Sequence, residues 1–204
     1  MRRDDAAPAT RLTPQQKVAI CAESALPMRD AVKVRDADIT YEFLVKNNCN
    51  ALGIIAAGVG PRMLKERGAT TALQLRRLGF DALHLVDQAF CQELLDAFGA
   101  DDTKQAFLTT PEDAVSIAGC ASVDLLNVSN CDLLAMCAGA PAAAEAVLQQ
   151  SALADPLAGI DVSVVLDTGL RSAQLAGLGY TAFRIQSSLL NCSPREILKL
   201  GFKI

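Results

Sequence analysis

The side chains best suited to catalysis are few in this chain. His84 is its single histidine, which excludes a metal site built from several histidines and leaves one residue for a cysteine–histidine pair. His84 lies between Leu83 and Leu85 in an apolar helical pattern. We therefore expect a structural or partly exposed histidine rather than a catalytic one.

The cysteines do not form a recognisable metal or redox motif. They are odd in number and scattered, without Cys-x-x-Cys spacing: Cys21, Cys49, Cys91, Cys120, Cys131, Cys137 and Cys192. Cys131 and Cys137 are six residues apart, a spacing that does not place them on neighbouring helical turns, so no zinc site is expected. Most cysteines lie among Ala, Leu and Val, where a reduced cysteine behaves as a small apolar residue. This usage predicts a reducing compartment.

Motifs for ligand binding are incomplete or missing. Gly58-Val59-Gly60 resembles half of a dinucleotide-binding loop, but Met63 stands where the third glycine belongs and no strand precedes the segment. The P-loop, Gly-x-Ser-x-Gly and His-Glu-x-x-His motifs do not occur. We therefore predict a protein that is not an enzyme, with no catalytic residues, no metal and no cofactor. An enzymatic or small-molecule-binding protein that uses cysteine or carboxylate chemistry remains the alternative.

The composition favours closely packed helices. Of 204 residues 51% are hydrophobic, yet aromatic residues make up 4% and Trp is absent, so Ala, Leu and Val supply the apolar side chains. This excludes a disordered or collagen-like chain, and a net charge of −4 argues against a general nucleic-acid binder. No apolar run is long enough for a membrane span or a signal peptide. We expect an intracellular protein, cytoplasmic or in an organelle.

Glycine recurs with a period of about 20 residues, and such a period is typical of repeat architectures. The recurring positions are Gly79, Gly99, Gly119, Gly139, Gly159, Gly179 and, after a two-residue slip, Gly201. Apolar residues stand one and four positions before most of these glycines, on one helical face, as Leu75 and Leu78 do before Gly79. An apolar residue such as Phe80 follows, which predicts a helix ended by a Schellman motif.

Capping residues then predict a second helix in each period. Asp81, Asp101, Asp161 and Thr181 are suitable N-caps, whereas Pro111, Pro141 and Pro194 suit the first turn of other helices. Helices this short need neighbours to be stable. We therefore predict an all-α fold, an αα-solenoid with a right-handed superhelix, built from helix-turn-helix repeats with glycine stops. It occupies residues 39–204, after a charged N-terminal arm (residues 1–38) with one helical stretch from Thr13 to Ser24.

Charge is segregated along the chain. Residues 78–170 carry fourteen acidic side chains and one basic side chain, Lys104, whereas residues 171–204 carry five basic and one acidic. Such an acidic segment favours a partner with a basic surface. The alternative is a solvated face whose carboxylates cap helices. The contact residues predicted on this segment are Glu93, Asp96, Glu112, Asp113 and Asp132.

The C-terminal residues are the second predicted contact region. Phe202 and Ile204 either fold back onto Leu198 or dock on another protein, and Tyr180 is grouped with them as a contact residue. Together these features predict a scaffold, adaptor or structural subunit of a larger assembly, whose partners are other protein subunits. A membrane-spanning segment and a small-molecule substrate are not expected. Nucleic-acid binding through the basic N-terminal region is a further alternative.

Overall fold

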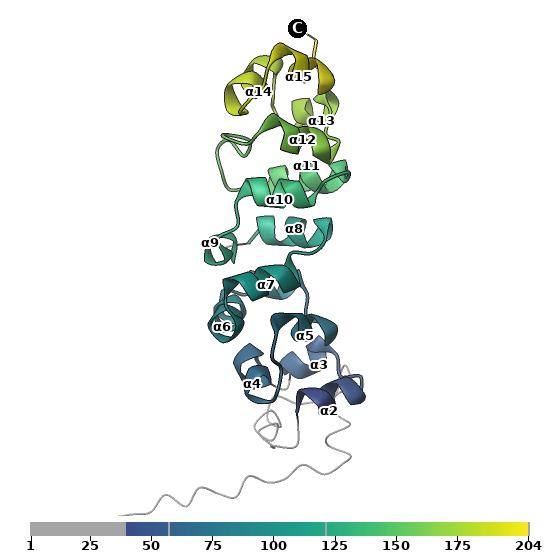
Figure 1. Ribbon diagram of the computed structural model, residues 1–204, viewed down its shortest axis with the longest axis vertical. Helices are drawn as coiled ribbons and strands as arrows, with labels where there is room; N and C mark the ends of the chain where they lie inside the picture. Colours follow the sequence, from purple (N-terminus) through teal and green to yellow (C-terminus); the bar gives the residue numbers. More distant parts are fainter. Residues whose placement is uncertain (1–39, 57, 121, 204) are drawn as a thin grey trace, which may run out of the picture. The chain divides into compact units, whose positions relative to one another are not determined.

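The computed structural model describes residues 40–56, 58–120 and 122–203. Within these ranges every regular element is a helix, and the only extended pairing is one isolated bridge between Asp161 and Leu190 (Figure 1). The all-α prediction is therefore confirmed. The predicted N-terminal arm, residues 1–38 with the helical stretch from Thr13 to Ser24, lies outside the described residues.

The described residues belong to two compact units. Unit 1 contains residues 40–80 and 93–102, and unit 2 contains residues 81–92 and 103–203. The helices of unit 1 are α2 (Tyr41–Lys46), α3 (Ala51–Ala56), α4 (Pro61–Glu66) and α5 (Ala72–Arg77), followed by the end of α6 (Gln88–Phe98) and the start of α7 (Ala100–Phe107). Each helix of α2 to α5 is six residues long, so none would be stable without its neighbours.

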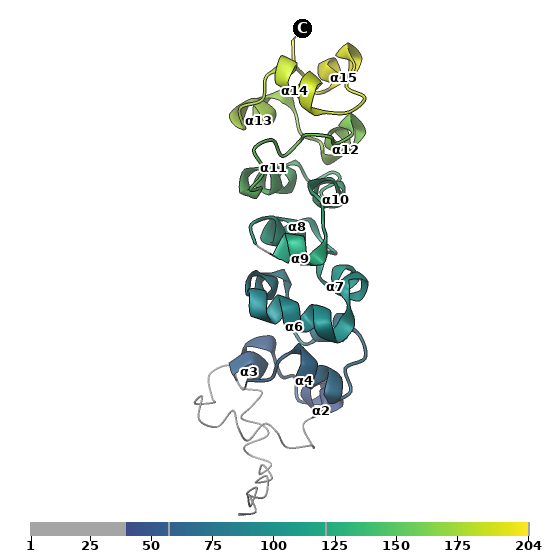
Figure 2. The same cartoon turned by 90° about the vertical axis from the view of Figure 1, so that its left-hand side faces the viewer.

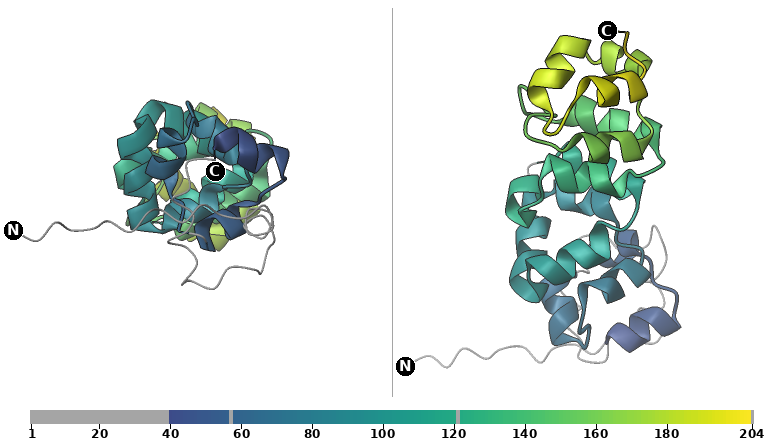
Figure 3. Two further views of the ribbon diagram at one scale, coloured as in Figure 1. Left: turned by 90° about the horizontal axis from the view of Figure 1, so that it is seen from below. Right: turned by 45° about the horizontal axis from the view of Figure 1, so that its top comes forward.

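Unit 2 holds the remaining helices. They are the 3-10 helix η2 (Ala82–Val86), α8 (Pro111–Ala118), α9 (Ser122–Leu126), α10 (Asn130–Met136), α11 (Pro141–Gln150), α12 (Val162–Thr168), α13 (Ser172–Gly177), α14 (Ala182–Ser188) and α15 (Pro194–Lys199). Helices α8, α10 and α11 contact one another, and α14 contacts α15 (Figure 2). Two further views show how short the helices are (Figure 3).

The core is formed by the same position in successive helices. The fourth residue of the helix is fully buried in α2, α3, α4 and α5, and again in many helices of unit 2, namely Leu44, Ile54, Leu64, Leu75, Leu85, Ala114, Leu133, Val165, Leu175 and Ile185. A helix of about one and a half turns presents only its first and fourth residues to one side. The prediction that Leu75, Leu175 and Ile197 face the core is confirmed, whereas Ala135, at the corresponding sequence position, is exposed.

Helix stops are confirmed at Gly79, Gly99, Gly179 and Gly201, but not at Gly119, at Gly159, which lies in a turn with no helix directly before it, or at Gly139, which follows the end of α10 by three residues. At Gly79, where φ is 90°, the amide of Gly79 donates to Arg76 O (3.0 Å) and that of Phe80 donates to Leu75 O (3.3 Å), which is the Schellman pattern. Gly119 instead has a φ of −87° and forms the C-cap of α8. A left-handed stop is also made by Asn48 (φ 52°), so such stops are not confined to the glycines of the periodic series.

The predicted helix starts are largely correct. Asp161 caps α12 by accepting from Ser163 N at 2.8 Å, and Asp81 and Thr181 cap η2 and α14. Prolines stand at the first turn of α8, α11 and α15 as expected. Asp101 is the exception, because α7 already begins at Ala100 and Asp101 lies within its first turn.

Backbone amides near helix starts donate hydrogen bonds to segments that are distant in the sequence. In unit 1, Tyr41 N donates to Arg67 O (2.9 Å) and Ala72 N donates to the Asp102 carboxylate (2.8 Å). In unit 2, Gly139 N donates to Asp167 O, Gly159 N to Ser188 O and Ser172 N to Leu200 O, at 2.7–2.9 Å. At Tyr41, Ala72 and Ser172, the first residues of their helices, these bonds satisfy amides that a helix leaves without internal acceptors. Donor and acceptor lie farther apart in the chain than the period of the glycines.

Candidate protein-binding surfaces

Two of the predicted acidic contact residues lie against a basic helix of their own unit. Glu93 Oε1 accepts from Arg62 N at 3.1 Å, and Asp96 forms an ion pair with the Arg62 guanidinium at 3.6 Å. The Lys65 ammonium, on the next turn of α4, donates to Ala97 O and lies 5.5 Å from the Phe98 ring centre. The carboxylates on α6 therefore have partners on α4, which reduces their capacity to attract another protein.

The acidic contact residues of unit 2 fall into two kinds. Asp113 is buried and Asp132 exposed, but both complete capping boxes, with Thr110 at the start of α8 and with Ser129 at the start of α10. Hydrogen bonds from the Ser129 amide and hydroxyl lower the pKa of Asp132. Glu112 is exposed, and no side-chain partner is found for it within the described residues. Of the three, Glu112 best fits a contact residue.

The C-terminal contact residues also differ from expectation. Tyr180 is 3% exposed, so it belongs to the interior and we do not retain it as a contact residue. Its burial has a local cause, because it follows Gly179 in the Schellman motif of α13, where Tyr180 N donates to Leu175 O at 2.9 Å. Phe202 occupies the same position after α15 and is half-buried, with its amide donating to Ile197 O. Ile204 lies outside the described residues.

Tyr180 is held by a polar cluster around Asp155. The Tyr180 hydroxyl donates to one Asp155 oxygen (2.8 Å) and the Ser188 hydroxyl donates to the other (2.6 Å). The Arg184 guanidinium lies 4.7 Å from the Tyr180 ring centre. Burial raises the pKa of Asp155, but the bonds from Ser188 and Tyr180 outweigh it, so the pKa is lowered overall. Burial, with the bond to Asp155, raises the pKa of Tyr180.

We expect this cluster to make the free energy of unfolding depend on pH in the acidic range. Because the pKa of Asp155 is lower in the folded chain than its ordinary value of 3.8, its contribution is complete above pH 3.8 and is lost as pH falls through the folded-state pKa. Tyr180→Phe should destabilise the protein by about 1 kcal/mol at neutral pH, and this difference should shrink at low pH. Urea unfolding of both proteins between pH 2 and 7 measures it. A difference that stays constant with pH would contradict the assignment, and Tyr41→Phe serves as the control.

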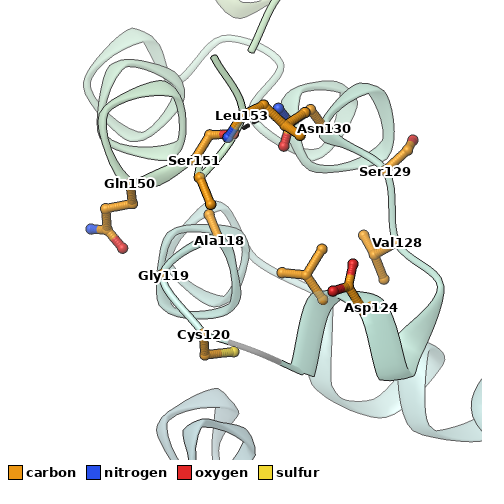
Figure 4. Close-up of a pocket in the computed structure, with 12 residues that line it drawn as sticks. Ala118, Gly119, Cys120, Asp124, Val128, Ser129, Asn130, Gln150, Ser151 and Leu153 are labelled. Atoms are coloured by element: carbon orange, nitrogen blue, oxygen red, sulfur yellow. Dashed lines mark hydrogen bonds between the residues drawn. The ribbon is translucent and has the colours of Figure 1, made fainter. Parts of the chain in front are cut away.

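A pocket of about 460 Å³ lies in unit 2 between α9 and the segment that follows α11 (Figure 4). Val128 and the Asp124 carboxylate lie on one side of it and Leu153 on the other, and Val123 also lines it. Asn130 fixes the side on which Leu153 lies, since its amide donates to Ser151 Oγ (3.0 Å) and to Pro156 O (3.1 Å). Sequence reasoning missed this pocket because its walls come from segments that are far apart in the chain.

Comparison of the chain with protein-family models, curated proteins and solved structures gives no match. Its function must therefore be inferred from its own sequence and structure. Within the described residues, no helix is both long and apolar enough to cross a bilayer. The same part of the chain holds no group of three or more side chains placed to bind a metal ion. His84 is partly exposed, and its Nδ1 accepts from Asp81 N at 3.0 Å beside the Asp81 carboxylate.

Most cysteines of the described residues are not disulfide-bonded. Cys91, Cys120, Cys131, Cys137 and Cys192 are thiols, and burial raises the pKa of both Cys137 and Cys192, which makes them weaker nucleophiles. Cys120 lines the pocket, and its thiol donates to Ile117 O at 3.1 Å. Cys49 is disulfide-bonded, which differs from the expectation that the cysteines are all reduced.

Large apolar side chains are exposed at two recurring helix positions, the second and the fifth, the fifth residue being Val45 in α2, Ile55 in α3, Val86 in η2 and Leu198 in α15. The second residue of the helix is Leu52 in α3, Leu73 in α5, Leu83 in η2 and Phe183 in α14, and each of these side chains is exposed, Phe183 by 81%. The residue two positions later in the same helices is buried. These exposed side chains therefore contribute little to the core and are available for contacts with another molecule.

Proposed function

We propose that this chain is a non-enzymatic helical-repeat protein that serves as a scaffold, adaptor or structural subunit of a larger protein assembly. The observation that carries the proposal is the recurrence of exposed large apolar side chains at the second helix position, two residues before a buried core residue. Single exposed apolar residues are ordinary, but their repetition in successive helices, together with a phenylalanine that is 81% exposed, favours a binding role.

The proposed architecture is an α-solenoid with a right-handed superhelix. Three features support it: the shortness of the helices, a core residue at the fourth helix position, and backbone hydrogen bonds between segments that are distant in the sequence. In this arrangement each helix would stack on one that lies two or three helices further along the chain. A helical stack of this kind offers a long surface for partners at modest chain length.

The proposed partner is a protein with a basic surface. Between residues 103 and 170 the one basic side chain is Lys104, and Glu112, Asp124 and Asp167 are exposed there. Within the described residues none of these three carboxylates has a hydrogen-bond or ion-pair partner. Carboxylates that face solvent without intramolecular partners raise encounter rates with basic surfaces, and salt weakens that attraction.

The test is the native mass of the tagged protein purified gently from its own cells at low salt. We expect a stoichiometric complex with other proteins, which Phe183→Asp should disrupt because it places a charge at the exposed apolar contact. Gln186→Asp, at an exposed polar position of the same helix α14, is the control and should leave the complex intact. A free 21.5 kDa monomer, or a complex insensitive to Phe183→Asp, would argue against the proposal.

A further inference from the structure

Helix α15 presents a surface that is both apolar and basic. Arg195, Leu198 and Lys199 lie at the three- and four-residue spacing of one helical face and are all exposed, while Ile197 is buried. Lys199 pairs with Glu196 at 3.4 Å. Arg195 and the exposed Lys203 have no acidic partner within the described residues. The face therefore combines a leucine that is 57% exposed with positive charge that is not neutralised.

The pocket beside α9 has the complementary properties. Its apolar lining consists of Val123, Val128 and Leu153, and the Asp124 carboxylate on the side of Val128 is exposed and has no partner among the described residues. Its volume of about 460 Å³ exceeds that of a leucine side chain. An apolar side chain flanked by basic groups would thus meet an apolar pocket flanked by an acidic group.

We propose that a second copy of this chain inserts the Leu198 side of its α15 into this pocket. Leu198 would contact Val123, Val128 and Leu153, while Arg195 of the inserted helix approaches Asp124. A second copy is the occupant that the charges favour, because residues 171–204 carry five basic and one acidic side chain and residues 103–170 carry one basic side chain. The inference rests on the proposed function, since it names one partner of a protein-binding repeat chain.

The two surfaces differ, so the contact is heterologous. Each copy would offer one α15 and one pocket, and copies would join head to tail into a ring or a filament rather than a closed two-fold dimer. A variant with a damaged pocket would still donate its α15, and a variant with a damaged α15 would still accept one. This asymmetry makes the proposal testable with the purified chain alone.

The experiment measures mass by sedimentation velocity across protein concentrations at low salt. We expect the mass to rise above 21.5 kDa with concentration and to fall when salt is added. Asp124→Arg and Leu198→Asp should each weaken self-association by about tenfold or more. An equimolar mixture of the two variants should recover a dimer, because one intact pocket meets one intact α15. Gln105→Arg and Gln186→Asp, at exposed polar positions outside both surfaces, are the controls.

Three results would overturn the inference: a wild-type monomer at every concentration, a mixture of the two variants that stays monomeric, or controls that fail as the test variants do. Far-ultraviolet circular dichroism of each variant separates misfolding from loss of contact. A purified monomer that still forms complexes with other proteins in its own cells would overturn this inference while leaving the proposed function intact. The reverse outcome, self-association without other partners, would count against the proposed function alone.

Discussion

Leu85→Ala should lower the free energy of unfolding by about 2–5 kcal/mol. Leu85 is the fourth residue of η2 and is fully buried, and η2 contacts α8 across the core of unit 2. Removing three carbons from this position forfeits the transfer free energy of the side chain and leaves a cavity. Short helices cannot close such a cavity easily, because the glycine and capping residues at both ends fix where each helix begins and stops. Urea unfolding at neutral pH measures the loss.

Leu83→Ala is the matched control. It makes the same chemical change two residues earlier in the same helix, where the side chain is 64% exposed. We expect a change within about 0.5 kcal/mol, as for most surface substitutions. Equal losses for the two variants would contradict the assignment of the fourth position as the core position. A loss at Leu83 alone would reverse the predicted orientation of η2.

The helices and their ends can be predicted because they depend on neighbouring residues. The stop at Gly79 follows from a glycine that tolerates a positive φ and from Phe80, which folds back on Leu75. The cap at Asp161 follows from one carboxylate and the amide two residues later. The prediction is wrong at Gly119 because its neighbours resemble those of the other stops, although in this case glycine forms the C-cap itself.

The features that depend on distant residues cannot be predicted in this way. The pocket needs Val123 and Leu153 to face each other, and Tyr180 needs Asp155 as its acceptor, each across a long stretch of chain. The period of the glycines does not reveal this longer spacing of contacts. Sequence reasoning therefore places the apolar partner contacts at Tyr180 and Phe202, whereas the most exposed large apolar side chain of the described residues is Phe183.

The sequence also does not distinguish the roles of two adjacent acidic residues. Glu112 and Asp113 are adjacent and are both predicted as partner contacts, yet only Glu112 is exposed. The Asp113 carboxylate accepts hydrogen bonds from Thr109 N, from Thr109 Oγ1 and from Thr110 N, at 3.0–3.2 Å. Thr110 Oγ1 accepts from the Asp113 amide in return. Adjacent carboxylates thus do different things, one capping a helix and one facing solvent.

Asp113→Ala should therefore destabilise the protein by about 2–3 kcal/mol, because it removes the capping box of α8 and leaves three partly buried donors without their acceptor. Glu112→Ala should change stability by less than about 0.5 kcal/mol and should instead weaken binding to a basic partner, with a smaller dependence on salt. Urea unfolding and partner binding, measured on both variants, give the comparison.

If Glu112→Ala destabilised the fold as much as Asp113→Ala, the carboxylate of Glu112 would have to be structural and the exposed acidic surface would lose its best contact residue. If binding fell only with Asp113→Ala, the acidic segment would act through the fold of α8 rather than through its charge.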